Sequence, residues 1–164
     1  MKKLRLWVSL MLMAALICAG TVASRAYVIT PSPSVFINEL HYDNASTDVG
    51  EFVEIAGPAG TYLSAYTLVL YNGSGGTPYD TRILSGIIAD EQNGFGAITF
   101  PYPVNGIQNG DPDGIALVGP GNTLLQFLSY DGAFTGVNGP ANGGMWRDYL
   151  RVVIDQRPRI SRIA

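Results

Sequence analysis

Six Asn-Gly pairs divide the middle of this chain into short segments, and no other sequence feature restricts its fold as strongly. Asparagine and glycine both tolerate the positive φ that tight turns between strands require. The six asparagines are Asn72, Asn93, Asn105, Asn109, Asn138 and Asn142. Turns this close together leave no room for long helices, and no helical periodicity is present between them. The sequence therefore predicts an all-β protein.

Short runs that are rich in β-branched and aromatic residues lie between the turns, and several of them alternate with a period of two. The predicted strands cover Val35–Leu40, Glu51–Ala56, Tyr66–Tyr71, Tyr79–Leu84, Phe95–Phe100, Ile115–Val118 and Thr123–Tyr130. Seven short strands with turns about every ten residues predict a β-sandwich. A chain of 164 residues is long enough for one such domain with a single core.

The N-terminus has the pattern of a secretory signal peptide. Three basic residues precede an apolar run from Leu6 to Ala19, and small residues follow it. We expect a signal peptide over residues 1–26, a signal helix ahead of the sandwich, a short linker over 27–34, and a secreted, extracellular protein. The apolar run is short for a bilayer span, so a membrane anchor formed by residues 6–23 is the alternative. Cys18 lies within this run, so cleavage would leave neither disulfides nor cysteine-based metal sites.

Charge is distributed very unevenly along the chain. Between Ala26 and Met145, Arg82 is the only basic residue against eleven acidic residues, which gives this segment a net charge of −10. Such a surface repels phosphate backbones, so direct nucleic-acid binding is not expected, and divalent cations are the natural counter-charge. Residues 145–164 invert the pattern, with five arginines, two aspartates and no glycine.

Several motifs occur in the order and spacing of a known domain. Phe-Ile-Asn-Glu-Leu-His-Tyr-Asp-Asn stands at 36–44 and Gly-Glu-Phe-Val-Glu-Ile-Ala-Gly-Pro-Ala-Gly at 50–60. Tyr-Thr-Leu-Val-Leu-Tyr-Asn-Gly follows at 66–73, and Pro-Asp-Gly-Ile-Ala-Leu-Val at 112–118. Together these motifs resemble the lamin-tail domain family, in its secreted bacterial branch, over residues 35–143.

The resemblance implies an immunoglobulin-like β-sandwich over residues 35–144. It also implies a non-catalytic module that serves in binding or adhesion and often precedes a nuclease domain in an extracellular protein. The family continues after Gly143 into a further apolar strand, which residues 145–164 do not resemble. We therefore expect either a frameshifted or truncated gene, which leaves the sandwich without a closing strand, or a genuine basic tail that binds an acidic surface.

Two groups of acidic residues suggest calcium. Residues 109–114, Asn-Gly-Asp-Pro-Asp-Gly, match the first half of a calcium loop, but Pro120 stands where an EF-hand requires glutamate. The candidate calcium ligands are Asp43, Asp48, Glu51, Asp111 and Asp113. The alternative is that these side chains cap turns of their own backbone. A calcium-dependent module that binds polysaccharide or a cell surface is one alternative function.

An enzymatic alternative centres on His41, the only histidine, which stands near Asp43 as a candidate base or metal ligand. With Glu51 and Glu54 these residues would form a small metal-dependent hydrolase, whereas a structural His41 would bond to backbone groups. Period two puts Phe52 and Glu54 on one strand face and Glu51, Val53 and Ile55 on the other, so one of the two glutamates must share a face with core residues. A buried carboxylate there requires backbone amides or a cation as partners.

Tyrosines offer one further candidate surface. Tyrosine stacks on the apolar faces of sugars, and a carbohydrate-binding face could include Tyr62, Tyr66, Tyr71, Tyr79 and Tyr102. The alternative is that they are ordinary, half-buried strand residues.

Overall fold

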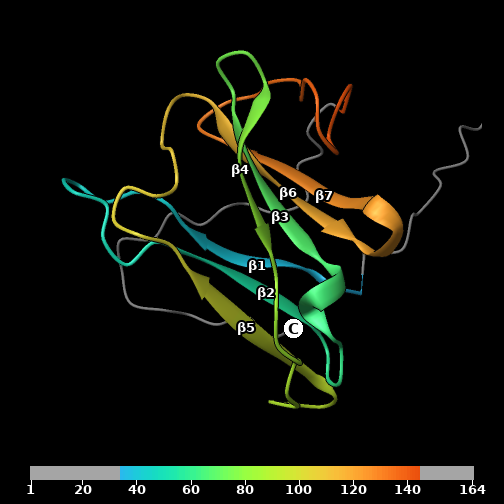
Figure 1. The fold of residues 1–164 in the computed structure, drawn as a ribbon. Coiled ribbons are helices and arrows are strands. Elements are labelled where there is room, and N and C mark those ends of the chain that lie inside the picture. The colour runs from blue at the N-terminus through green and yellow to red at the C-terminus, as the bar shows by residue number, and fades with distance from the viewer. Residues whose placement is uncertain (1–33, 145–164) are drawn as a thin grey trace, which may run out of the picture. The chain divides into compact units, whose positions relative to one another are not determined.

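The computed structural model describes residues 34–144 (Figure 1). The predicted signal peptide, nearly all of the linker, and the basic tail 145–164 lie outside the described residues, so the expectations for them stay predictions.

No helix within residues 34–144 is long and apolar enough to cross a membrane.

Seven strands form two antiparallel sheets. The first sheet has the order β1-β2-β5, with β1 at Phe36–His41, β2 at Phe52–Pro58 and β5 at Phe95–Pro101. The second has the order β4-β3-β6-β7, with β3 at Thr67–Asn72, β4 at Thr77–Ile83, β6 at Asp113–Gly119 and β7 at Thr123–Tyr130. Single turns of 3₁₀-helix cover Leu63–Ala65 and Pro120–Asn122. Each strand overlaps a predicted one, which confirms the expected immunoglobulin-like β-sandwich.

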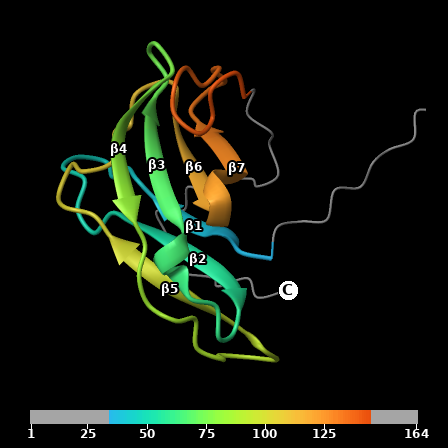
Figure 2. The same cartoon turned by 45° about the vertical axis from the view of Figure 1, so that its right-hand side comes forward.

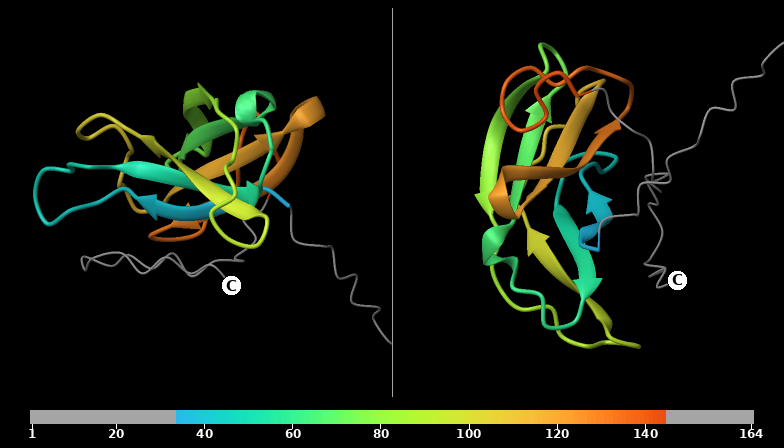
Figure 3. Two further views of the ribbon diagram at one scale, coloured as in Figure 1. Left: turned by 90° about the horizontal axis from the view of Figure 1, so that it is seen from below. Right: turned by 90° about the vertical axis from the view of Figure 1, so that its right-hand side faces the viewer.

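The main core lies between the two sheets, which form two layers (Figures 2 and 3). In β2, buried and partly exposed residues alternate, so that Val53 and Ile55 point inward and are fully buried. Leu68 and Leu70 of β3 approach the same core from the other sheet. The inward residues of each strand are separated by one position, as the period of two requires for residues on one face.

A second apolar cluster lies on the outer face of the larger sheet. It contains Val69, Tyr71, Ala116, Val118 and Phe127, and it is covered by Ala141 and Phe134. We call residues 131–144 the cover segment; in Figure 1 it is the red-orange chain that crosses the end of β6 and β7. The ring of Phe134 meets that of Phe127 edge-on, with the centroids 5.4 Å apart. The larger sheet is consequently apolar on both faces.

The sheets are also joined along one side by a side chain. The backbone N–H of Ile37 in β1 donates to Gln126 Oε1 of β7 at 2.6 Å. Both strands are edge strands of their sheets. This bond occupies an N–H that an edge strand would otherwise leave unpaired.

Candidate functional site at one end of the sandwich

Strand register brings two long loops to one end of the sandwich. β1 ends and β2 begins at the paired residues His41 and Phe52, so the loop 42–51 lies here. β2 begins opposite Pro101, where the loop 102–112 leaves β5. β6 begins at Asp113, opposite the ends of both β3 and β7. We call this the loop end.

Glu51 fixes one of these loops to the sheet. Its side chain is completely buried, and its two carboxylate oxygens accept hydrogen bonds from the backbone N–H groups of Gly106 at 2.7 Å and Ile107 at 3.0 Å. The sequence predicted that one glutamate of this strand faces the core with polar partners; that glutamate is Glu51, and its partners are backbone amides. A carboxylate with two such donors is compensated for its loss of water.

Asp113 connects the loop 102–112 to the turn between β3 and β4. It is 2% exposed, and it accepts from Gly73 N at 2.9 Å and from Gly110 N at 2.7 Å. Gly73 belongs to the turn between β3 and β4, whereas Gly110 belongs to the loop 102–112. One buried carboxylate thus ties together two turns that are distant in sequence.

Asp48 is the third buried carboxylate at the loop end. Its Oδ1 accepts from Asn44 N at 2.8 Å, and its own N–H donates to Asn105 Oδ1 at 3.1 Å. Asn109 Nδ2 donates both to Asp48 Oδ2 at 3.2 Å and to Asp43 Oδ1 at 3.0 Å. The loops 42–51 and 102–112 are therefore cross-linked by side chains along their length.

Two tyrosine hydroxyls hold the middle of the loop 102–112. Gln108 N donates to the Tyr79 hydroxyl at 2.8 Å, and the Tyr130 hydroxyl donates to Gln108 O at 2.8 Å. Burial raises the pKa of Tyr79 to about 12, and burial, together with Tyr79 and Asp113, raises the pKa of Tyr130 still further. Tyr130 accordingly keeps the proton that its bond to Gln108 requires.

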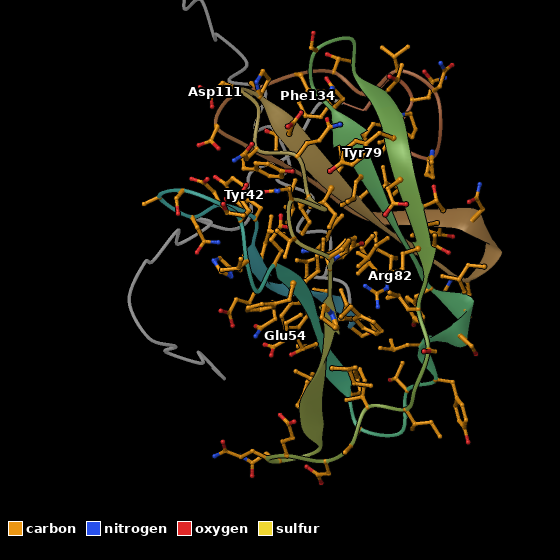
Figure 4. All side chains as sticks on the ribbon, turned by 60° about the vertical axis from the view of Figure 1, so that its left-hand side comes forward. Tyr42, Glu54, Tyr79, Arg82, Asp111 and Phe134 are labelled. Carbon is orange, nitrogen blue, oxygen red and sulfur yellow. The ribbon has the colours of Figure 1, made fainter. Side chains whose placement is uncertain are left out.

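Acidic side chains gather above this framework. The Tyr42 hydroxyl donates to Asp131 Oδ2 at 2.7 Å. The pKa of Tyr42 is raised by burial first, then by Asp131, and further by the charges of Asp43 and Asp111. All three carboxylates thus act on one hydroxyl group. We call Asp43, Asp111 and Asp131 the acidic cluster; Figure 4 shows Tyr42 and Asp111 on one side of the molecule and Arg82 at a distance from both residues.

The five calcium candidates consequently divide into two kinds. Asp48, Glu51 and Asp113 are buried and bond to backbone N–H groups. Asp48 and Asp113 each cap a turn close to them in sequence, whereas Glu51 binds the distant loop 102–112. Asp43 and Asp111 lie in the acidic cluster with Asp131, which the sequence analysis did not single out. Within residues 34–144, no three His, Cys, Asp or Glu side chains have the arrangement of a metal site. Calcium binding stays a prediction.

The four residues of the hydrolase alternative do not surround one point. His41 Nδ1 lies 3.1 Å from Gly50 O, and its ring packs edge-on against Phe52. Glu51 and Glu54 face opposite sides of the sheet, Glu51 inward to the loop 102–112 and Glu54 outward. The Glu54 carboxylate accepts from Asn38 Nδ2 at 2.7 Å and Thr99 Oγ1 at 3.3 Å.

The tyrosines do not form a shared face either. Tyr71 is buried beneath the cover segment, and Tyr79 holds Gln108. Tyr66 and Tyr102 pack, partly buried, against the main core, and only Tyr62 is largely exposed, at 67%. Of the five, Tyr71 and Tyr79 are strand residues, whereas Tyr66 and Tyr102 lie directly beside strand ends.

Arg82 is the only Lys or Arg of the described residues, and it lies beside a shallow pocket. The pocket has a volume of about 460 Å³ and is lined by Asp80, Thr81, Arg82, Tyr102, Pro103 and Gly106. The guanidinium lies over the ring of Tyr102, 5.0 Å from its centroid. The Tyr102 hydroxyl is buried and finds no hydrogen-bond partner among residues 34–144. Burial raises the pKa of Tyr102 to about 12; Asp80 contributes to the rise and Arg82 opposes it.

The chain matches no protein-family model, no curated protein and no solved structure.

Proposed function

We propose that this chain is a secreted, non-catalytic, lamin-tail-like binding module, the N-terminal part of a larger extracellular protein such as a nuclease. The observation that carries the proposal is that the buried carboxylates hold the loops of one end of the sandwich in place. Glu51, Asp113 and Asp48 all bond to backbone groups of the loop end. Loops that are held rigid on a β-scaffold are the usual location of binding residues.

The acidic cluster favours calcium-dependent binding as the more specific form of this proposal. The charges of Asp43, Asp111 and Asp131 all act on the Tyr42 hydroxyl, and the one arginine of the described residues is bonded to Pro101 on β5. Carboxylate oxygens are the ligands that calcium prefers, and modest affinity is sufficient outside cells. A calcium ion held here would leave coordination positions for hydroxyl groups of a polysaccharide or cell-surface ligand.

Retention on insoluble polysaccharides tests the binding role. The purified chain is passed over cellulose, chitin and peptidoglycan, each with millimolar calcium and with chelator. We expect retention on at least one matrix in calcium, and loss of that retention in the triple variant Asp43→Asn, Asp111→Asn, Asp131→Asn. The matched control, Asp90→Asn with Glu91→Gln, removes exposed charges from the loop between β4 and β5 and keeps retention.

A parallel assay tests the non-catalytic character. The chain is incubated with ester, phosphodiester and glycoside substrates in the presence of calcium, magnesium or manganese. We expect no turnover above buffer. Turnover that disappears in a folded His41→Ala variant would establish the hydrolase instead and overturn the proposal.

A further inference from the structure

The six Asn-Gly pairs are sites of a known chemical reaction as well as turns. The backbone nitrogen of the glycine can attack Cγ of the preceding asparagine, forming a C–N bond and expelling ammonia. The resulting succinimide is opened by water to aspartate or isoaspartate. Glycine offers no side chain to hinder the attack, so all six pairs are susceptible in an unfolded chain. The attacking nitrogen must first lose its proton, and a hydrogen bond from that N–H to an acceptor opposes this loss.

In the folded protein, five of the six glycine N–H groups donate such a bond. The pairs are Gly73 to Asp113 Oδ1 at 2.9 Å, Gly94 to Asp90 Oδ1 at 3.0 Å, Gly106 to Glu51 Oε2 at 2.7 Å, Gly110 to Asp113 Oδ2 at 2.7 Å, and Gly143 to Gly136 O at 2.9 Å. Four of these acceptors are carboxylate oxygens, from Asp113, Asp90 and Glu51, and their charge also opposes deprotonation of the N–H.

Gly139 is the exception, because its N–H donates to no group within residues 34–144. Asn138 and Gly139 are both exposed and both have positive φ, 67° and 60°. Asn138 shares this backbone conformation with Asn93 and Asn105, whose following glycines are bonded to carboxylates. The conformation therefore does not distinguish the three sites, but the lack of an acceptor for Gly139 N–H among residues 34–144 does.

We propose that Asn138 is the deamidation site of the folded protein. The reaction consumes only water and releases ammonia, so it needs no partner enzyme. Its position gives it a structural effect. Asn138 lies between two anchors of the cover segment, the bond from Val137 N to Gly76 O at 2.6 Å and the bond from Ala141 N to the Tyr71 hydroxyl at 2.9 Å.

The main chain between these two anchors has no room for extra length. A Cβ atom on Gly139 would lie 2.7 Å from the Tyr71 hydroxyl oxygen. Isoaspartate at position 138 lengthens the main chain by one methylene group, and this extra length has to be accommodated where the backbone already touches Tyr71. Deamidation therefore loosens the cover segment over the apolar outer face of the larger sheet.

The experiment follows all six sites in one sample. The purified full chain is incubated in mildly alkaline buffer, with and without concentrated urea, and peptides are analysed over time by mass spectrometry for ammonia loss and for deamidation. In native buffer we expect Asn138 to react about tenfold faster than each other site, since a local opening that costs about 1.4 kcal/mol slows a reaction tenfold. In urea the six rates converge.

Two variants make the test specific. Asn138→Gly tolerates the positive φ and abolishes the signal at this position. Asp90→Ala alters an exposed residue and frees Gly94 N alone, so Asn93 accelerates while the other rates stay unchanged. Native-buffer rates that are equal at all six sites, or another asparagine reacting ahead of Asn138, would overturn the proposal. So would an unchanged Asn93 rate in Asp90→Ala.

Discussion

Arg82 Nη1 on β4 donates to the carbonyl oxygen of Pro101 on β5 at 2.6 Å, and so joins the edge strands of the two sheets. Arg82 on β4 is paired in register with Leu68 of β3, whose side chain points into the main core. The side chain of Arg82 therefore points inward as well. Its guanidinium covers the ring of Phe100, 5.4 Å from the centroid. An inward-pointing charge on an edge strand is a known protection against edge-to-edge association. One arginine thus closes this side of the sandwich and protects its edge.

Replacement of Arg82 should accordingly reduce stability. We expect Arg82→Ala to lower the free energy of unfolding by about 1–3 kcal/mol, through loss of the bond to Pro101 and of the stacking on two rings. Arg82→Lys retains the charge but not the planar stacking, so the decrease in unfolding free energy should be smaller than in Arg82→Ala. Chemical denaturation measures both, and Thr81→Ala on the outward face of β4 serves as control. An Arg82→Ala variant as stable as the wild type would contradict this role.

Removal of the Glu51 carboxylate should release the loop 102–112. Glu51→Ala leaves the N–H groups of Gly106 and Ile107 without their acceptor, and we expect a loss of about 2–4 kcal/mol in unfolding free energy. Glu51→Gln keeps one acceptor oxygen and should lose less. Hydrogen exchange should accelerate at these two amides ahead of the rest of the sheet. Glu54→Gln, on the outer face of β2, should change stability by under about 0.5 kcal/mol; equal effects at both glutamates would refute the loop-holding role.

Alkaline pH should destabilise the fold through its buried tyrosines. Burial raises the pKa of Tyr79 and that of Tyr102 from 10.0 to about 12. The unfolded chain therefore loses these protons at lower pH than the folded chain does, so stability is intact below pH 10 and falls between pH 10 and 12. Denaturation at a series of pH values measures the fall, and phenolate absorbance follows the titration.

Single substitutions separate the two tyrosines. Tyr79→Phe removes the acceptor of Gln108 N and should cost about 1 kcal/mol at neutral pH. Tyr102→Phe removes a hydroxyl that has no partner among the described residues, and should leave neutral-pH stability unchanged. In each variant, the decrease in stability at alkaline pH should be smaller than in the wild type. A fall of full size in both variants would assign the pH dependence to other groups.

Local sequence pattern predicted the strands because turn residues and period-two alternation are properties of neighbouring residues. The same alternation required one of Glu51 and Glu54 to face the core with polar partners, and the structure shows that it is Glu51. The identity of those partners could not be predicted, since Gly106 and Ile107 lie more than fifty residues further along the chain. Asp131 was missed for a related reason: only the pairing of strand ends brings it to the Tyr42 hydroxyl.

The cover segment was not predicted, although the sequence of the strand that it covers indicated that both faces of this strand are buried. Predicted strand Tyr66–Tyr71 contains the run Leu-Val-Leu-Tyr, which is apolar on both faces, and a strand of this kind is normally covered on both sides. The segment that covers it has the composition of a turn, with Asn-Gly pairs at 138 and 142 and no alternation of its own. Its position follows from contacts to Tyr71 and Phe127, and no local pattern specifies these.

Loss of the Tyr71 hydroxyl should free the cover segment. This hydroxyl accepts from Ala141 N and donates to Asn138 O at 3.2 Å, while the ring itself is buried in the outer cluster. Tyr71→Phe keeps the ring, and we expect it to cost about 1–2 kcal/mol because the buried Ala141 N–H loses its acceptor. A freer segment also reaches the cyclising geometry more often, so deamidation of Asn138 should accelerate while that of Asn93, at the other end of the sandwich, keeps its rate. Peptide mass spectrometry on the two proteins side by side measures both sites, and equal acceleration at Asn93 would show that the variant had loosened the whole fold instead of the cover segment.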